Sequence, residues 1–502
     1  MKADACARSL NHNDMSTFWK SVYCMNNKNV AGDVTTVGGI SGDYNVADLW
    51  KQHFEKVYNC ISDNHSKQSL FDRMAGLNSC AVVTVQDVID AMKRQKKGKA
   101  AGPDGLVMEA FIFGSVRLFT HLSLLFTLFI KHGYVPELFK QSTIVPLVKN
   151  KCGDMSDVNN YRAIALSTAT SKILETIIMG SIVSNDANDV YQFGFKGGHS
   201  TALCTHVLKR TVNYYVDRGS HVFACFVDFT KAFDRVNYWK LFNMLVDDRI
   251  DVGIVKMLTF WYSHQVVCVN WHGVLSSGFK TGNGTRQGGI LSPYLFTRYI
   301  RGLISAITAT RIGCNVGGVG VNILAYADDI VLLAPSWRAL QDLVNILHTY
   351  AQQIDMVCNV KKTCCMIFSP KCKQKVVATA FPSILLGGAA LQFVSTFRYL
   401  GHVISNDQLD NDDIKREIRN MYIRANILNR RFSKCSLKVK LRLFQTYCLC
   451  FYDVALWSIM LVFITVLSHV IIVVLRSSLV TGVMTVLQGC CLMLVCQLLI
   501  LL

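Results

Sequence analysis

The stretch that most restricts the fold of this chain is ILAYADDIVLLA, residues 323–334, in which two adjacent acids interrupt an apolar run. Each half of the run has the residue types of a buried strand. Because an unpaired carboxylate is costly to bury, Asp328 and Asp329 do not suit the middle of one strand. We therefore predict two strands joined by a tight turn, with both carboxylates at the tip. The simplest alternative is an ordinary hairpin whose turn contains Asp, a favoured turn residue.

A third acid follows another buried strand. The segment HVFACFVDF places Asp228 directly after an apolar run. An acid at the end of one strand and an acid pair on a hairpin can converge on one face of a sheet, where they repel one another unless divalent cations lie between them. Oxygen ligands of this kind suit Mg²⁺, and paired ions activate an attacking hydroxyl in phosphoryl transfer. Asp234 is a poorer ligand candidate, since the dipole of the following helix explains an acid there.

The overall charge favours a polyanionic partner. A formal net charge of +18 indicates nucleic acid or an anionic membrane, although a solvated basic surface would give the same count. The 19 cysteines are scattered or adjacent, and no Cys-x-x-Cys pair faces a second Cys/His pair. This pattern argues against a zinc finger or zinc knuckle and indicates a reducing, intracellular compartment.

The composition changes along the chain. Residues 1–80 are polar and weakly patterned, which predicts a poorly structured leader or a truncated upstream remnant. From residue 81 the pattern is globular, with strand-like and helix-like runs alternating as in α/β and α+β enzymes. In residues 454–502 the only Lys, Arg, Asp or Glu is Arg476, and the apolar runs on either side are each long enough to span a bilayer.

Several motifs occur together in an order typical of one family. FVDFTKAFDRV, TRQGGILSPYLF, AYADDIVLLA, NVKKT and FRYLGHVIS follow one another with the spacing of a reverse transcriptase. The chain resembles the reverse transcriptases of non-LTR (LINE-type, jockey-like) retrotransposons. The resemblance implies an α+β right-hand polymerase fold. Its parts would be an N-terminal extension and fingers (81–225), a palm with an antiparallel sheet (226–405) and the start of a basic helical thumb (406–453).

The implied function is RNA-directed DNA polymerisation, which copies RNA into cDNA by two-metal nucleotidyl transfer. The implied partners are an RNA template, a DNA primer, deoxynucleoside triphosphates and the element's RNA, in a ribonucleoprotein of nucleus and cytoplasm. We expect endonuclease activity to be absent from this chain. The alternatives are an inactive nucleic-acid-binding remnant and, on the strength of residues 454–502, a membrane protein. We interpret that tail first as the product of a reading-frame shift and second as a membrane anchor.

The resemblance also assigns the catalytic roles. Asp228, Asp328 and Asp329 would hold two Mg²⁺ ions, or Mn²⁺ in their place, with help from the backbone carbonyl of Phe229. Asp328 is the firmest metal ligand among them, and Asp329 acts more through its charge. Lys362 aligns with the general acid that protonates the pyrophosphate leaving group.

The residues that the resemblance places against the incoming nucleotide are Arg162, Lys149, Lys151, Phe233, Gln287 and Gly288. Phe233 matches the steric gate, whose ring fills the space that a ribose 2′-hydroxyl needs. A guanidinium suits bidentate phosphate binding, and glycine lets the backbone approach a base pair closely. The alternatives are an ordinary core phenylalanine for Phe233 and a solvated basic loop for the lysines.

The primer grip, a hairpin that places the 3′ end of the primer, would comprise Phe397, Arg398, Tyr399, Leu400 and Gly401. The next segment, residues 412–444, is basic with a helical pattern. Cationic side chains on such a helix fit the backbone of a nucleic-acid duplex, to which they give salt-dependent affinity without sequence preference.

Overall fold

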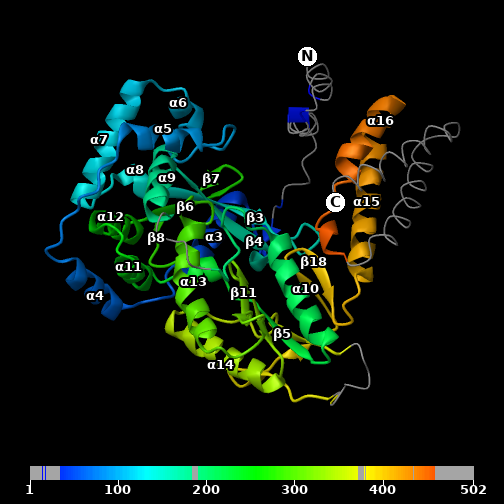
Figure 1. Ribbon diagram of the computed structural model, residues 1–502. Coiled ribbons are helices and arrows are strands. Elements are labelled where there is room, and N and C mark those ends of the chain that lie inside the picture. Colours follow the sequence, from blue (N-terminus) through cyan, green and yellow to red (C-terminus); the bar gives the residue numbers. More distant parts are fainter. Residues whose placement is uncertain are drawn as a thin grey trace.

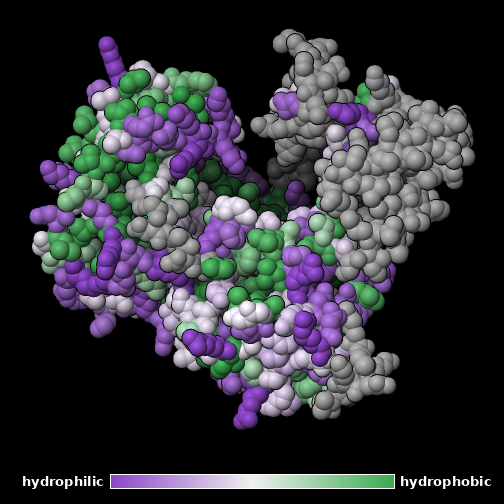
Figure 2. Space-filling model, viewed as in Figure 1, coloured by the Kyte–Doolittle hydropathy of each residue, from purple (hydrophilic) through white to green (hydrophobic). Residues whose placement is uncertain are grey.

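The computed structural model describes residues 36–183, 190–370, 380–433 and 435–457, together with the single residues 9, 14, 17, 18, 34 and 378. Helices and sheets are mixed in an α+β fold, as the sequence predicted (Figure 1). A lobe that carries α5 (Val85–Lys93) lies on one side, and α15 (Asn411–Arg431) stands on the other. Figure 2 shows that the surface beside this lobe is deeply hollowed.

A five-stranded sheet forms the centre of the molecule. The predicted hairpin is confirmed, since β11 and β12 pair antiparallel, β12 pairs antiparallel with β5, and β5 with β13. The edge strand β16 pairs parallel with β13. In sheet order the strands are β11 (Ile323–Tyr326), β12 (Asp329–Ala334), β5 (Val222–Val227), β13 (Cys364–Phe368) and β16 (Gln392–Phe393).

Both faces of this sheet are buried, which explains the nearly continuous apolar runs in its strands. All six residues of β5 are buried, and successive residues belong to different core clusters. Helix α10 (Thr201–Asp217) contributes to the cluster on one face. Helices α13 (Ser292–Ala309) and α14 (Trp337–Gln353) contribute to the cluster on the other. With both faces covered, only the ends of the strands can present charged groups to solvent.

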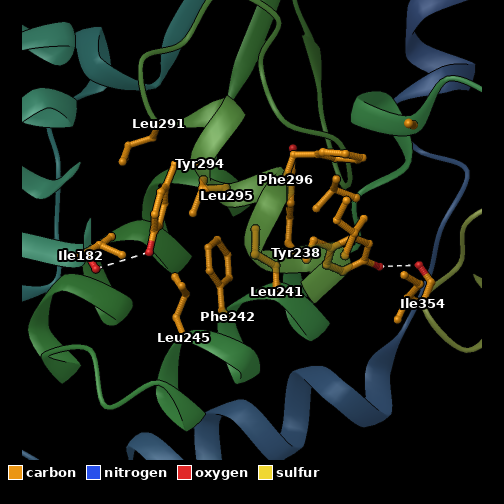
Figure 3. Close-up of a cluster of buried hydrophobic side chains, with 14 of the residues drawn as sticks. Ile182, Tyr238, Leu241, Phe242, Leu245, Leu291, Tyr294, Leu295, Phe296 and Ile354 are labelled. Atoms are coloured by element: carbon orange, nitrogen blue, oxygen red, sulfur yellow. Dashed lines mark hydrogen bonds between the residues drawn. The ribbon is translucent and has the colours of Figure 1, made fainter. Parts of the chain in front are cut away.

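The larger core cluster continues between α13 and α11 (Tyr238–Asp247), where aromatic and aliphatic side chains interleave (Figure 3). Full burial of a side chain such as Phe242 or Leu295 contributes about 1.5–3 kcal/mol. Two tyrosine hydroxyls in this core find carbonyl acceptors, Tyr294 on Ile182 at 3.3 Å and Tyr299 on Ile354 at 2.5 Å. The core therefore holds α13 rigidly behind the central sheet.

A second five-stranded sheet lies beside the first. Its strands are β4 (Tyr161–Ser167), β3 (Gln141–Val148), β6 (Val266–Trp271), β7 (Val274–Leu275) and β8 (Phe279–Lys280). Strands β3 and β4 are antiparallel, whereas β3 and β6 are parallel. Helix α3 (Asp43–Val57) packs against this sheet through Trp50 and Phe54.

The prediction of a poorly structured leader over residues 1–80 is wrong for the part described, because α3 and α4 (Asn64–Met74) are well-formed helices. The signal was present in the sequence. Val46, Trp50 and Phe54 recur every four residues, which is typical of one apolar helix face. Burying Trp50 completely against the second sheet ties this segment to the rest of the fold.

The remaining elements complete the fold around the two sheets. The predicted basic helical segment forms α15 and α16 (Leu437–Leu443). The other helices are α6 (Met108–Ile112), α7 (Val116–His132), α8 (Glu137–Lys140), α9 (Ala169–Val183) and α12 (Val252–Ser263). Hairpins are formed by β1 (Thr36–Val37) with β2 (Ile40–Ser41), β9 (Asn315–Val316) with β10 (Val319–Gly320), β14 (Leu385–Leu386) with β15 (Ala389–Ala390), and β17 (Thr396–Tyr399) with β18 (His402–Ser405).

The membrane expectation depends on the apolar tail. Among the helices in the described ranges, none combines the length and the apolar character needed to cross a bilayer. Residues 458–502, which make up nearly all of the tail, lie outside the described residues. The expectations of a frame-shifted end and of a membrane anchor both stay predictions.

Candidate active site

The acid pair lies at the tip of the β11–β12 hairpin, as predicted. Tyr326 pairs with Asp329, so that Ala327 and Asp328 form the turn between the strands. In the next ladder Ile330 pairs with Val227, and continuing this register places Asp329 beside Asp228, the residue that follows β5. The structure therefore brings the three predicted carboxylates to one edge of the central sheet.

The turn is held in place from behind by residues 191–194. Ala327 has a φ of 57°, a backbone conformation that is costly for an L residue. The side-chain oxygen of the buried Gln192 accepts hydrogen bonds from the backbone N–H groups of Ala327, at 2.9 Å, and Gly194, at 2.8 Å. A Cβ atom on Gly194 would lie 2.5 Å from the Ala327 nitrogen, so only glycine fits there. Sequence reasoning assigned no role to Gln192.

Asp228 is fixed by the segment that precedes β13. The backbone N–H of Asp228 donates to the Thr363 hydroxyl at 3.2 Å, and its carbonyl accepts from the N–H of Asn359 at 2.7 Å. Phe229, whose ring is buried, forms a bridge with Cys358. Lys362 lies in the same segment and is exposed. The predicted general acid is thus carried by the loop that positions the first acid.

The three carboxylates repel one another. Burial raises the pKa of Asp328, and the nearby Asp228 raises it further, against the attraction of Arg162. The pKa of Asp329 rises to about 6, first through reduced solvation and then through Asp328 and Asp228, even though its side chain is exposed at the tip. Within the described residues, none of the three forms an ion pair with a basic side chain. A bound cation would relieve this repulsion.

These carboxylates fit Mg²⁺ in the way that nucleotide-handling enzymes use it. No three His, Cys, Asp or Glu side chains of the described chain are already gathered closely enough to hold a metal ion. Mg²⁺ usually takes only one or two carboxylates, and phosphates of the substrate complete its shell. In the described part of the chain the three carboxylates form no ion pair, so their oxygens are the kind of donor that this mode requires.

Basic side chains gather beside the acids. Lys149 follows β3, Arg162 lies in β4, Lys231 follows β5, and Lys362 precedes β13. Burial lowers the pKa of Lys149, and repulsion from Lys231, Arg162 and Lys362 lowers it further, against the attraction of Asp234. None of these four cations forms an ion pair in the part of the chain that the structure describes. Such an excess of positive charge favours an anionic ligand.

Two of these positions change the sequence-based picture. Lys231 joins the cluster although sequence reasoning passed over it. Lys151, predicted to bind the nucleotide, lies exposed in the turn after Lys149 and, within the described ranges, makes no ion pair. The Lys149 ammonium donates to the carbonyl of Asn159 at 3.0 Å, which fixes it between the ends of β3 and β4.

Asp234 is a buried acceptor, so the helix-dipole interpretation misses its main contacts. It lies in a 3₁₀ turn, Ala232–Arg235, and is only 8% exposed. Its carboxylate accepts from the Tyr58 hydroxyl at 3.2 Å and from the Gln287 amide at 3.0 Å. Burial raises its pKa to about 6, although Lys231 and these hydrogen bonds act in the opposite direction. Asp234 therefore orients the predicted nucleotide contact Gln287.

The loop that contains Gln287 also contacts β4. The Gln287 carbonyl accepts from the N–H of Ala165 at 2.7 Å. Gly288 has a φ of 114°, and a Cβ atom there would lie 2.8 Å from the Ala165 carbonyl oxygen. The buried pair between Arg286 and Glu175, at 2.7 Å, anchors the loop from the other side. The loop is therefore rigid and joins the two sheets.

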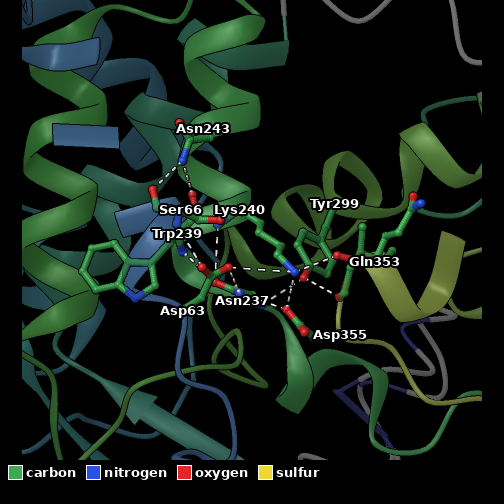
Figure 4. Close-up of polar contacts among 10 residues, drawn as sticks. Asp63, Ser66, Asn237, Trp239, Lys240, Asn243, Tyr299, Gln353 and Asp355 are labelled. Atoms are coloured by element: carbon green, nitrogen blue, oxygen red, sulfur yellow. Dashed lines mark hydrogen bonds and ion pairs between the residues drawn. The ribbon is translucent and has the colours of Figure 1, made fainter. Parts of the chain in front are cut away.

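Phe233 is half-buried, which is less than the core interpretation predicts. Its ring stacks on Phe296 with centroids 4.2 Å apart and meets Phe195 edge-on at 6.4 Å. A polar network around Asn237 fixes the end of the turn that carries Phe233 (Figure 4). The Asn237 amide donates to Asp63 at 3.0 Å and to Asp355 at 2.9 Å. The ring of Phe233 thus projects from a turn that is fixed at both ends.

The predicted primer-grip residues form the β17–β18 hairpin. Leu400 and Gly401 make its turn, with φ values of 47° and 90°. Phe397 stacks on Phe226 of β5 with ring centroids 4.3 Å apart, and Tyr399 is buried. Arg398 is exposed. The hairpin therefore packs against the central sheet, and the charged side chain of Arg398 faces solvent.

Comparisons with known proteins show which family the chain resembles. Residues 148–404 match the model of the family described as reverse transcriptase (RNA-dependent DNA polymerase). The chain is 24% identical over 379 residues to the RNA-directed DNA polymerase from mobile element jockey of Drosophila funebris, covering 72% of this chain and 40% of that protein. It is 25% identical over 400 residues to the probable RNA-directed DNA polymerase from transposon BS of Drosophila melanogaster, covering 75% and 42%. The chain thus spans less than half the length of these relatives.

Proposed function

Since this chain belongs to the reverse transcriptase family, among relatives from LINE-type elements, we propose that it extends a DNA primer along an RNA template. The observation that carries the proposal is the convergence of Asp228 with Asp328 and Asp329, next to basic side chains that form no ion pair among the described residues. Carboxylates and free cations side by side suit a reaction in which a metal-bound triphosphate is the substrate.

The acids are proposed to hold divalent cations, Mg²⁺ or Mn²⁺, with the Phe229 carbonyl as a further donor. When bound, these ions neutralise phosphate charge and favour ionisation of the primer 3′-hydroxyl. Asp328 and Asp228 supply the ligand oxygens, and Asp329 supplies negative charge. The Gln192 and Thr363 contacts hold the acids in place, so that little reorganisation is needed as charge develops.

The cations are proposed to bind the triphosphate. Arg162 offers a planar fork of donors, whereas Lys149 and Lys231 act as point charges. Lys362, exposed at the same cluster, is placed to protonate the departing pyrophosphate. Beside them the half-buried ring of Phe233 would close the space for a 2′-hydroxyl and so favour deoxynucleotides. Gln287 and Gly288 would contact the base pair being formed.

A neighbouring cavity is suited to the template. It has a volume of 590 Å³, adjoins Gly288, and is lined by the basic side chains Arg94, Lys96, Lys99 and Lys172. In this assignment the second sheet and the α5–α9 lobe act as fingers, the central sheet as palm, the β17–β18 hairpin as primer grip, and α15 as the start of the thumb. Association with the element's RNA in nucleus and cytoplasm belongs to the same proposal.

Primer extension on an RNA template with Mg²⁺ tests this function. The wild-type chain should extend the primer, and Asp228→Ala and Asp328→Asn should each reduce the rate by about a thousandfold or more. Asp407→Asn, at an exposed position outside the site, is the matched control and should extend normally. If both active-site variants extend as the wild type does, the site assignment is wrong. Retained RNA binding without wild-type extension would favour the inactive remnant instead.

A further inference from the structure

His53 contacts the cation cluster from a helix outside the family-matched region. It lies on α3, residues 43–57, whereas the match covers residues 148–404. Its Nε2 atom is 3.3 Å from the ammonium nitrogen of Lys231. An ammonium group can only donate, so Nε2 must accept, which places the ring hydrogen on Nδ1 and leaves the imidazole neutral.

The surroundings of His53 keep it neutral. Burial lowers its pKa to about 4, and repulsion from Lys231, Lys149 and Lys56 acts in the same direction, against Asp157. The ring is held edge-on between Trp50, at 6.0 Å between centroids, and Phe54, at 5.3 Å. A neutral acceptor can orient the Lys231 ammonium and leave its charge intact, whereas a carboxylate there would cancel that charge.

Lys231 has a strained backbone conformation and an ammonium group that can bind an anion. Its φ is 50°, in the left-handed region, and it lies between Asp228 and Phe233. Strain of this kind persists only where surrounding contacts impose it. Among nearby charges, the buried Asp234 acts most strongly to raise the pKa of Lys231, and Asp234 is already bonded to Tyr58 and Gln287. The ammonium therefore stays available to an external anion.

We propose that His53 is a positioning residue, which holds the Lys231 ammonium so that it binds a phosphate of the incoming nucleotide. The proposal rests on the proposed polymerase function and extends it, because it makes α3, outside the residues matched by the family model, a determinant of nucleotide affinity. The predicted effect is specific to phosphate binding, since His53 touches neither the acids nor the template cavity.

Single-nucleotide incorporation by the full chain separates this role from a structural one. His53→Phe keeps the ring contacts with Trp50 and Phe54 but removes the acceptor. It should raise KM for the deoxynucleotide about five- to tenfold, with kcat within about twofold of the wild type. His53→Gln restores an acceptor and should return KM to near the wild-type value. His272→Phe is the matched control, since His272 also contacts α3, through Asp43 at 3.0 Å, and should leave KM unchanged.

Binding of inorganic tripolyphosphate, measured by calorimetry without primer or template, gives a readout that does not need activity. Affinity should fall about five- to tenfold in His53→Phe and in Lys231→Ala, and recover in His53→Gln. If His53→Phe binds tripolyphosphate as the wild type does, the positioning role is wrong even when extension is normal. Loss of extension in the wild type with this binding pattern intact would instead contradict the polymerase proposal alone.

Discussion

Two acidic clusters in this chain are built in opposite ways. At the edge of the central sheet, Asp228, Asp328 and Asp329 face one another, and none has a cationic partner among the described residues. Where β18 meets α15, Asp413 accepts hydrogen bonds from Arg416 at 2.7 Å, from the N–H of Val403 at 2.9 Å and from the Trp457 indole at 2.9 Å. Its carboxylate also lies 3.1 Å from His402.

The pKa values of the acids are shifted in opposite directions in the two clusters. Burial alone would raise the pKa of Asp413, but His402 and the Arg416 guanidinium hold it well below its usual range. The pKa values of Asp328 and Asp329 are raised instead. One cluster stabilises the folded chain through its negative charge, and the other weakens it. We infer that the chain retains the repelling acids at the sheet edge because they bind a ligand. Substitutions in the two clusters test this comparison.

The largest effect on stability is expected at Asp413. Asp413→Ala removes a buried carboxylate that accepts from Arg416, from the N–H of Val403 and from the Trp457 indole, and should lower the free energy of unfolding by about 3 kcal/mol. Urea denaturation measures this loss. The neighbouring Asp412→Ala is the control, since the Asp412–Lys415 pair is largely exposed and should contribute less than about 0.5 kcal/mol. Equal losses in the two variants would show that the buried network does not stabilise the fold.

A smaller effect of opposite sign is expected at the sheet edge. Asp328→Asn keeps the shape of the side chain and removes one of the repelling charges. In the absence of divalent cations the free energy of unfolding should rise by about 1 kcal/mol, again by urea denaturation. A loss of stability of similar size would make Asp328 a structural residue, and the contrast between the clusters would disappear.

The smallest effect is a difference in pH dependence. The folded chain holds the Asp329 proton to about pH 6, whereas the ordinary value is 3.8, so stability falls as pH rises from about 4 to about 6. Asp329→Asn should flatten this fall by less than about 1 kcal/mol, because the side chain is exposed. Asp234 titrates in the same range, so the variant must be compared with the wild type at each pH. Identical curves would contradict the raised pKa.

Asp413 should behave in the opposite way. Its pKa is lowered in the folded chain, so its contribution is present above the ordinary value of 3.8 and is lost as pH falls below about 4. In Asp413→Ala the acid limb of the stability curve should therefore be shallower than in the wild type. Thermal melts between pH 2 and pH 5 would detect it, and an unchanged acid limb would argue against the lowered pKa.

The sequence predicted the parts of the site that local patterns determine. The strands around Asp228 and Asp328 have apolar runs that end at the acids, so the hairpin and its carboxylates could be placed without a structure. The family motifs then supplied roles for Phe233 and Gln287, and the structure brings Gln287 into contact with Asp234, the residue after Phe233. Residues 46–54 also have the periodicity of a helix, but the prediction for residues 1–80 missed it because the surrounding composition is polar.

Contacts between distant segments could not be predicted. Asp234 accepts from Tyr58, which directly follows α3, and Lys231 contacts His53 on α3, so both contacts come from a segment far earlier in the chain. Nothing in the neighbouring residues distinguishes Asp234 from an ordinary helix-start acid. Likewise, Gln192 reaches the hairpin turn only because the chain returns beside β11. Tertiary packing determines these roles, so the spacing of residues in the sequence does not predict them.

The most direct test of the central claim measures how Mg²⁺ changes the free energy of unfolding at neutral pH. If the sheet-edge acids are kept for divalent cations, saturating Mg²⁺ should stabilise the wild-type chain by about 1–3 kcal/mol. The gain should vanish in the double variant Asp228→Asn and Asp328→Asn and persist in Asp412→Ala. An equal gain in the double variant and the wild type would contradict the account, because Mg²⁺ would then bind elsewhere.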